Sequence, residues 1–221
     1  MIQIEDLSFH YADGGFSLRL ASLHVQIAER VAIVGASGCG KPTLATLIAG
    51  ICVCETGRIT VNQAALSEMT DRQRRDFRIA NVGFIFQEFE LLEYLRVDQN
   101  VLLPYFINRS LRLDQQARLR AQSLLESVGL GDKTRRFPGQ LSQGERQRVA
   151  ICRALVTEPP VIIADEPTGD LDPDNAAAVM DLIHEQMQRR QATFVMITHD
   201  RSLLDRFDRV IDLQRTAGDQ T

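Results

Sequence analysis

The most informative segment of this chain is Gly35-Ala36-Ser37-Gly38-Cys39-Gly40-Lys41-Pro42-Thr43. It follows the pattern G-x-x-x-x-G-K-[ST] at Gly35, Gly40 and Lys41, and departs from it at Pro42. Glycines let the backbone curl so that its N–H groups point at phosphate oxygens, and the lysine adds a charge that reaches the β and γ phosphates. The stretch from Gly35 to Thr43 is therefore predicted to bind a nucleoside triphosphate.

The sequence on both sides of this loop supports that interpretation. The short apolar run Val31–Val34 leads into the loop, and the helix-like segment Leu44–Gly50 leaves it. A strand, a glycine turn and a helix in that order direct a helix N-terminus at an anion.

Pro42 occupies the position where the pattern requires a serine or threonine to bind Mg²⁺. Proline is tolerated in a first helical turn, but it has no N–H and is expected to bias Lys41 away from helical geometry. Losing one charge-assisted hydrogen bond costs about 1.5–3 kcal/mol, which is roughly ten- to a hundredfold in affinity. Thr43 carries a hydroxyl, but one residue along the helix it should point elsewhere.

Composition places the chain among ordinary globular proteins, with 221 residues, 44% hydrophobic and 24% charged. The net charge of −4 gives no overall basic surface for nucleic acid. No apolar run is long enough to span a membrane and the N-terminus lacks the features of a signal peptide, so a cytosolic chain is expected. Cys52 and Cys54 alone have poor spacing for zinc, which favours reduced thiols.

The alternation of apolar runs predicts an α/β fold. Early runs over 2–9, 16–20 and 23–27 alternate as in strands of a small antiparallel sheet. Continuous apolar runs then recur between helical segments, as expected for a buried parallel sheet; they cover 31–34, 82–86, 161–164, 194–197 and 210–213.

Residues 88–140 lack strand-like runs. Within them one helical face is apolar and ends at a glycine; it comprises Ala117, Ala121, Leu124, Leu125 and Val128, followed by Gly129. We interpret the chain as one domain, 1–221, with an α/β core over 1–87 and 141–221 and a helical insertion over 88–140. Helices are predicted from about Thr43, over 142–156 and from about Asp174.

Polar residues follow the predicted parallel strands, where ligands gather in such sheets. Gln87, the pair Asp165-Glu166 and His199 each stand directly after an apolar run. Asp165 is placed to hold Mg²⁺, and Glu166 to accept a proton from an attacking water or to polarise it. Phosphoryl transfer needs mainly positioning and charge neutralisation, so these groups are sufficient equipment.

The segment Leu141–Glu145 has two interpretations. Ser142 followed by Glu145 is a capping box, which simply starts a helix. Alternatively, the helix N-terminus with Ser142 and the Gly144 amide is a second phosphate site. One chain does not easily bring this segment to its own glycine loop, so it would act on a partner's nucleotide.

Taken together, these motifs resemble the ATP-binding subunit of ABC transporters over nearly the whole chain. The correspondence is as follows: Tyr11 resembles the aromatic residue that stacks on adenine, Gly35–Thr43 the Walker A loop, Gln87 the Q-loop glutamine, Leu141–Glu145 the signature, Asp165 and Glu166 the Walker B aspartate and catalytic glutamate, 169–172 the D-loop, and His199 the switch histidine. Gln143 and Glu145 depart mildly from the signature.

The resemblance implies a P-loop NTPase core with a mostly parallel sheet, an N-terminal antiparallel β subdomain and an inserted helical subdomain. It also implies ATP and Mg²⁺ as cofactors, Gln87 sensing the metal and water, and head-to-tail homodimers or heterodimers that sandwich two ATP molecules. Membrane-spanning permease subunits would dock on the helical insertion near Gln87, which places the chain peripherally on the cytoplasmic face of the inner membrane.

Several short segments resemble the lipoprotein-release and macrolide-export group; they are 84–87, 91–92, 100–101, Pro104 and 164–169. The first functional hypothesis is thus an ATP-hydrolysing subunit of an exporter, which the presence of Glu166 and His199 favours. The second is a degenerate nucleotide-binding or regulatory subunit, which Pro42 favours. The third hypothesis is a soluble ABC ATPase of DNA repair or translation. Such proteins usually carry a second cassette or a coiled-coil insertion, and neither is visible in this sequence, which disfavours this hypothesis.

Overall fold

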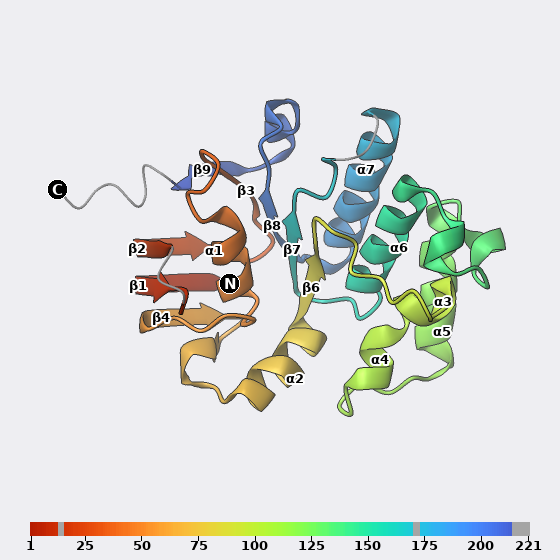
Figure 1. Ribbon diagram of the computed structural model, residues 1–221, viewed down its shortest axis with the longest axis horizontal. Coiled ribbons are helices and arrows are strands. Elements are labelled where there is room, and N and C mark those ends of the chain that lie inside the picture. Colours follow the sequence, from red (N-terminus) through yellow and green to blue (C-terminus); the bar gives the residue numbers. More distant parts are fainter. Residues whose placement is uncertain (13–15, 170–172, 214–221) are drawn as a thin grey trace.

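Five of the predicted apolar runs form the central sheet of the molecule. The computed structural model describes residues 1–12, 16–169 and 173–213, and in it five parallel strands pair in the order β6-β7-β8-β3-β9 (Figure 1). Their bounds are β3 (Arg30–Val34), β6 (Val82–Ile85), β7 (Val161–Asp165), β8 (Thr193–Ile197) and β9 (Arg209–Asp212). The predicted α/β fold with a parallel sheet is confirmed.

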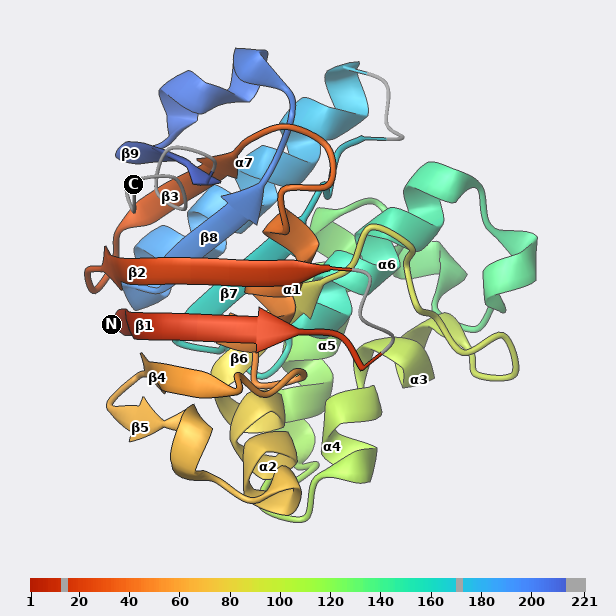
Figure 2. The same cartoon turned by 60° about the vertical axis from the view of Figure 1, so that its left-hand side comes forward.

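A second, antiparallel sheet lies beside the first, as predicted for the N-terminal part (Figure 2). Its order is β2-β1-β4-β5, with β1 (Ile2–His10), β2 (Ser17–Val25), β4 (Thr56–Val61) and β5 (Ala64–Ala65).

The expectation of separate strands over 16–20 and 23–27 is wrong, because both runs belong to β2. The buried positions of β2 change phase between Leu20 and Leu23, opposite Asp6 of β1. Asp6 has a φ of 46°, and the pairing of β1 with β4 shifts register between Glu5 and Ser8. A local irregularity of this kind moves the side-chain alternation by one residue without ending a strand.

The helices occupy three places around the sheets. Helix α1 (Lys41–Ile48) lies between the two sheets, whereas α6 (Gln143–Leu155) and α7 (Pro173–Arg190) cover the other face of the parallel sheet (Figure 1). Beyond α6 lie the helices of the predicted insertion, α3 (Val97–Val101), α4 (Leu103–Ile107) and α5 (Gln115–Ser127). Short 3₁₀ helices cover Leu66–Glu68, Gly131–Lys133, Pro138–Gln140 and Arg201–Arg206.

Helix α2 (Asp71–Asn81) is an element that our sequence analysis did not predict. Its capping box was visible in the sequence, since Thr70 caps the backbone N–H of Gln73 and the Gln73 side chain accepts from the Thr70 N–H. The helix has no fully buried residue, which explains why an apolar pattern did not reveal it. Strand β6 ends at Ile85, one residue earlier than predicted.

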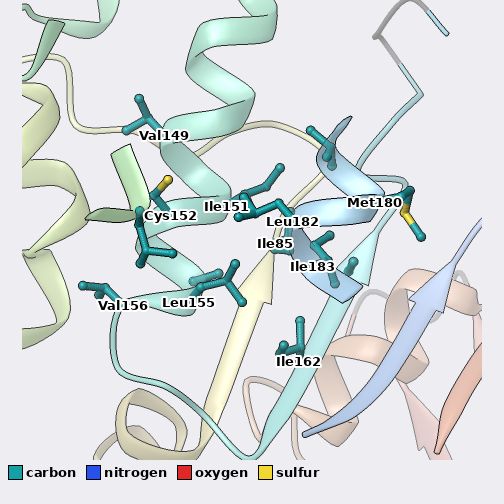
Figure 3. Close-up of a cluster of buried hydrophobic side chains, with 14 of the residues drawn as sticks. Ile85, Val149, Ile151, Cys152, Leu155, Val156, Ile162, Met180, Leu182 and Ile183 are labelled. Carbon is teal, nitrogen blue, oxygen red and sulfur yellow. The ribbon is translucent and has the colours of Figure 1, made fainter. Parts of the chain in front are cut away.

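Alternate residues of the parallel sheet enter two separate cores. Ile33, Ile163 and Val195 pack toward α1 and the antiparallel sheet, while Ala32 and Ile162 pack toward α6 and α7. Figure 3 shows part of the second core, where side chains of α6 and α7 meet those of β6 and β7. Over the described residues, no helix combines the length and low polarity that a membrane span requires.

Candidate active site

The strand order brings the predicted polar residues to one edge of the parallel sheet. Gln87 follows β6, Asp165 ends β7, His199 follows β8, and the glycine loop follows β3. Because β6, β7, β8 and β3 are consecutive neighbours and all parallel, these four segments stand in a row. Ligands of open α/β sheets bind at such an edge.

The glycine loop depends on backbone conformations that other residues rarely adopt. Gly38 has a φ of 79°, and a Cβ added there would meet nothing within 4 Å, so its outer side is open. Gly40 has a φ of 98° and caps α1, and a Cβ there would lie 2.6 Å from the Phe16 ring. The loop thus leads into the helix N-terminus without side chains over it at Gly38, as an anion site needs.

Lys41 is held by the carbonyl groups of its own loop. Its Nζ donates to the backbone oxygens of Gly35 (2.9 Å) and Ala36 (3.0 Å), and the residue is buried. Its ammonium group therefore already stands at the loop, with backbone oxygens that phosphate oxygens can replace.

Pro42 is the second residue of α1 and is exposed to solvent. The expectation that it displaces Lys41 from helical geometry is wrong, because Lys41 is the first residue of α1. A proline here replaces one of the N–H groups that have no partner within the helix, so the helix starts normally. What the substitution removes is an amide donor and a hydroxyl at the loop.

Thr43 and Tyr11 contact each other next to the loop. The Thr43 hydroxyl lies 3.2 Å from that of Tyr11, and Thr43 is buried. Tyr11 is 39% exposed and packs edge-on against Phe9, with ring centroids 4.8 Å apart. The Thr43 hydroxyl is thus engaged away from the position of Pro42, and Tyr11 offers a partly free aromatic ring.

Asp165 is partly buried and incompletely paired. Its Oδ1 atom is buried with no hydrogen-bond partner among the described residues. Burial raises its pKa to about 6, with a further rise from the neighbouring Glu166 charge and an opposing effect of Lys41. A buried carboxylate oxygen without a partner suits a hard cation such as Mg²⁺.

A cation here would need oxygen ligands besides Asp165. Within the part of the chain that the structure describes, no group of three or more histidine, cysteine, aspartate or glutamate residues gathers as for a metal held by protein alone.

Glu166 and His199 form a close pair. The Glu166 Oε2 and His199 Nδ1 atoms are 2.7 Å apart, joining the ends of the adjacent strands β7 and β8. The Glu166 side chain is 21% exposed and that of His199 is 69% exposed. Glu166 adopts a φ of 46°, and its N–H donates to the Ile197 carbonyl. The two side chains therefore sit at the mouth of the site, where a water can reach the carboxylate.

Gln87 lies in the exposed segment after β6. This segment is attached to α6, since the Arg153 guanidinium donates to the carbonyl groups of Phe89 (2.7 Å) and Glu90. Arg146 lies 5.6 Å from the centre of the Phe89 ring, a cation–π contact. Sequence reasoning missed both arginines, because their partners are backbone atoms and a ring from a distant segment.

The capping box at the start of α6 is present. The Ser142 hydroxyl accepts from the Glu145 N–H (3.3 Å), and the Glu145 carboxylate accepts from the Ser142 N–H (2.8 Å). Lys133 pairs with Glu145 and, together with this capping, lowers the pKa of that carboxyl. The structure does not bring Ser142 and Gly144 to the chain's own glycine loop, because α1 and α6 cover opposite faces of the sheet. The D-loop prediction, 169–172, falls outside the described residues beyond Gly169.

Three features therefore stand at one sheet edge: the glycine loop, the incompletely paired carboxylate of Asp165, and the contact between Glu166 and His199. Together they define a P-loop nucleotide-binding protein. A model of the ABC transporter family matches residues 18–169. The chain belongs to the ABC transporter family, as an ATP-binding subunit of the ATPase class.

Individual relatives are similar over almost the whole chain. The lipoprotein-releasing system ATP-binding protein LolD of Coxiella burnetii is 39% identical, covering 97% of this chain and 93% of its own length. The putative hemin import ATP-binding protein HrtA of Staphylococcus aureus is also 39% identical, covering 96% of each.

Among solved structures, the dimeric bacterial ABC transporter cassette MJ0796 matches with a TM-score of 0.87 and 31% identity, over 96% of this chain and 94% of that one. A dimeric post-hydrolysis state of the same cassette is bound to ADP and Pi, with a TM-score of 0.87 and 30% identity. The predicted resemblance and fold are confirmed; the roles of individual residues remain predictions.

Proposed function

We propose that this chain hydrolyses ATP to power transport through separate membrane-spanning subunits, in export or lipoprotein release. The observation that carries the proposal is the Glu166–His199 pair at the same sheet edge as the glycine loop; His199 follows β8, the neighbour of β3, and Glu166 follows β7, the next strand. The similarity to LolD supports the lipoprotein-release assignment. HrtA, which is equally similar, is named for import, so the direction of transport rests on the resemblance to LolD alone.

In this proposal the glycine loop binds the triphosphate. Lys41 exchanges the carbonyl groups of Gly35 and Ala36 for phosphate oxygens, while N–H groups of the loop between Gly35 and Thr43, other than at Pro42, which has none, donate to them. Tyr11 stacks on the adenine through its exposed ring face. Each of these contacts orients the nucleotide toward β7 and β8.

Asp165 and Gln87 would hold Mg²⁺, which when bound neutralises phosphate charge. Glu166 orients the attacking water and accepts or polarises its proton. His199 Nδ1 holds the Glu166 carboxylate in place at 2.7 Å and can turn toward the γ phosphate when nucleotide is present. The exposure of His199 leaves it free to make that contact.

We propose further that two chains complete each other's sites. Ser142 and Gly144 lie at the exposed start of α6, on the face of the sheet opposite α1, so they would meet the nucleotide of a second chain. The dimeric state of the related cassette supports a homodimer or a heterodimer with another cassette.

The test of this sandwich is the size of the Glu166→Gln variant in solution. Blocking hydrolysis is expected to trap an ATP-bound dimer, measured by size-exclusion chromatography with light scattering, in Mg-ATP but not in Mg-ADP. A monomer under both conditions would show that this chain alone does not form the sandwich.

The permease is proposed to dock where the helical insertion, residues 88–140, joins the α/β core, residues 1–87 and 141–221. A groove of about 240 Å³ lies there, and its lining includes Phe84, Phe86, Leu103, Pro104, Ile107 and Arg153. Phe86 and Glu90, which also lines it, stand on either side of Gln87, so an occupant of the groove would touch the segment that carries Gln87. This placement would put the chain peripherally on the cytoplasmic face of the inner membrane.

If the permease docks in this groove, a substitution in the groove should weaken its binding to the chain. Ile107 is 61% exposed at the groove, so Ile107→Arg is expected to reduce recovery of a co-expressed permease with the chain. Leu119→Arg, at an exposed site of α5 outside the groove, is the matched control. Equal recovery with both variants, at unchanged unfolding temperature, would place the permease elsewhere.

A second candidate function is that of a degenerate ATP-binding or regulatory subunit. The observation that favours it is Pro42, which leaves the start of α1 without the hydroxyl and amide of the motif. The presence of Glu166 and His199 in contact favours the active assignment. The two functions differ in the turnover of the wild-type chain, which the substitution of Pro42 described below measures.

A further inference from the structure

Gln147 is a polar residue that is almost fully buried near the start of α6. It lies on α6, is 2% exposed, and its Nε2 donates to the Pro167 carbonyl at 2.7 Å. Its Oε1 is buried and has no partner among the described residues. If the side-chain amide were turned over, Gln147 Oε1 would face the Pro167 carbonyl oxygen, and both atoms are acceptors. The Gln147 NH₂ group must therefore be the one that donates to Pro167.

Pro167 directly follows Glu166 in a tight turn. The Gly169 N–H donates to the Glu166 carbonyl, and the Glu166 N–H donates to Ile197 of β8. Gln147 adds a hydrogen bond from a different element, helix α6. Glu166 needs such support because its φ of 46° is unfavourable for a residue with a side chain.

Helix α6, which carries Gln147, is held in place by core packing and by its N-terminal cap. Ile151 and Leu155 lie on the side of α6 that faces β6, β7 and α7, and Val149 is buried on the opposite side of the helix (Figure 3). The capping box with Ser142 fixes the first turn of the same helix. The buried amide of Gln147 therefore connects α6 to the turn that carries Glu166.

We propose that Gln147 is a positioning residue for hydrolysis: it holds the Pro167 carbonyl so that the Glu166 carboxylate stands at the angle required to orient the attacking water. The proposal rests on the proposed role of Glu166. It makes α6, the helix whose N-terminus is proposed to meet the second nucleotide, also the support of the chain's own glutamate. An interaction that acts only on this turn should change turnover and leave nucleotide binding alone.

The test compares Gln147→Met, which keeps the length but has no donor, with Gln147→Asn, which keeps the donor but is too short. Both are expected to lower kcat for ATP about ten- to a hundredfold, with KM within about twofold of wild type. Cys152→Ala is the matched control, because Cys152 is a buried residue of α6 that lies in the apolar core; it should keep the wild-type kcat. The ATP affinity and the unfolding temperature of each variant show whether it is folded. One folded Gln147 variant is enough for the comparison of kcat with wild type.

A double-mutant cycle separates positioning from general damage. In a Glu166→Gln background, Gln147→Met should lower the residual single-turnover rate less than about twofold, since the group it positions is gone. Wild-type kcat in both Gln147 variants, or an equal loss in both backgrounds, would overturn the positioning role. Wild-type turnover in Glu166→Gln alone would instead overturn the role given to Glu166.

Discussion

The glycine loop and the turn that carries Glu166 stand at the same sheet edge but are held in opposite ways. The loop is closed by its own backbone, with Lys41 donating to Gly35 and Ala36. The turn is held by distant parts of the chain, namely Ile197, His199 and Gln147. The loop is therefore a local structure and the turn a product of the tertiary fold.

The two regions also differ in how completely they match the family pattern. The loop has lost a hydroxyl and an N–H at Pro42, while the turn keeps its glutamate and the histidine that contacts it. Since α1 begins normally despite the proline, the loss concerns ligand contacts and not folding. Under the proposed function, the loop would limit the binding of ATP and the turn would carry out its hydrolysis.

The largest effect is expected at the turn. Glu166→Gln removes the proton acceptor and should lower ATP turnover at least about a hundredfold, measured as phosphate release. Affinity for Mg-ATP, measured with a fluorescent nucleotide, should change by less than about twofold, because the loop is untouched. A parallel loss of affinity and turnover would break the division between the two regions.

At the loop, Pro42→Ser is expected to raise both Mg-ATP affinity and turnover, by roughly ten- to a hundredfold in affinity. The same two measurements on wild type and variant decide this. Pro42→Ala is the control, since it restores the N–H without the hydroxyl and should recover only part of the gain. Equal values in wild type and Pro42→Ser would refute the importance given to this position; a wild type without turnover that gains it would favour the degenerate function.

A smaller effect is expected at the rim of the loop. Tyr11→Ala should weaken ATP binding about two- to tenfold through loss of the aromatic surface, with little effect on the rate of the bound state. Tyr11→Phe keeps the ring and loses only the contact with the Thr43 hydroxyl, so it should bind nearly as wild type. If Tyr11→Phe were as weak as Tyr11→Ala, the Thr43 contact and not stacking would explain the role of Tyr11.

The smallest effect concerns thiol chemistry and leaves activity aside. Burial raises the pKa of Cys152 in α6 to about 12, so this thiol stays protonated at pH 8 and should react with a thiol reagent only after unfolding. Cys39, partly exposed in the glycine loop, should react in the native protein and be protected by ATP. Peptide mapping of the labelled sites measures both; native labelling of Cys152 would contradict its burial.

Much of the architecture could be predicted from local patterns. The apolar runs that became β3, β7 and β8 were recognisable because strands buried on both faces are continuously apolar. The split of β2 into two strands was a wrong prediction, because the irregularity at Asp6 shifts the alternation without ending the strand. Helix α2 was missed because its residues remain at the surface.

The candidate site could be predicted only in part. The residues that follow strands were identifiable, since parallel strands present their carboxyl ends at one edge. The effect of Pro42 on Lys41 was misjudged, because the preference of an isolated dipeptide yields to the helix that follows. Gln147 and Arg153 gave no signal, as their partners are carbonyl oxygens that every residue carries.

The glycine loop, the buried parallel strands and the polar residues that follow them can be read along the chain, because they depend on sequence neighbours and on the period of apolar residues. The contact of Glu166 with His199, the hydrogen bond from Gln147 to Pro167 and the placement of α6 on the face opposite α1 become apparent only in the folded molecule. Hydrogen bonds between distant segments depend on how the strands are ordered and on which face each helix covers, and no short stretch of sequence encodes either.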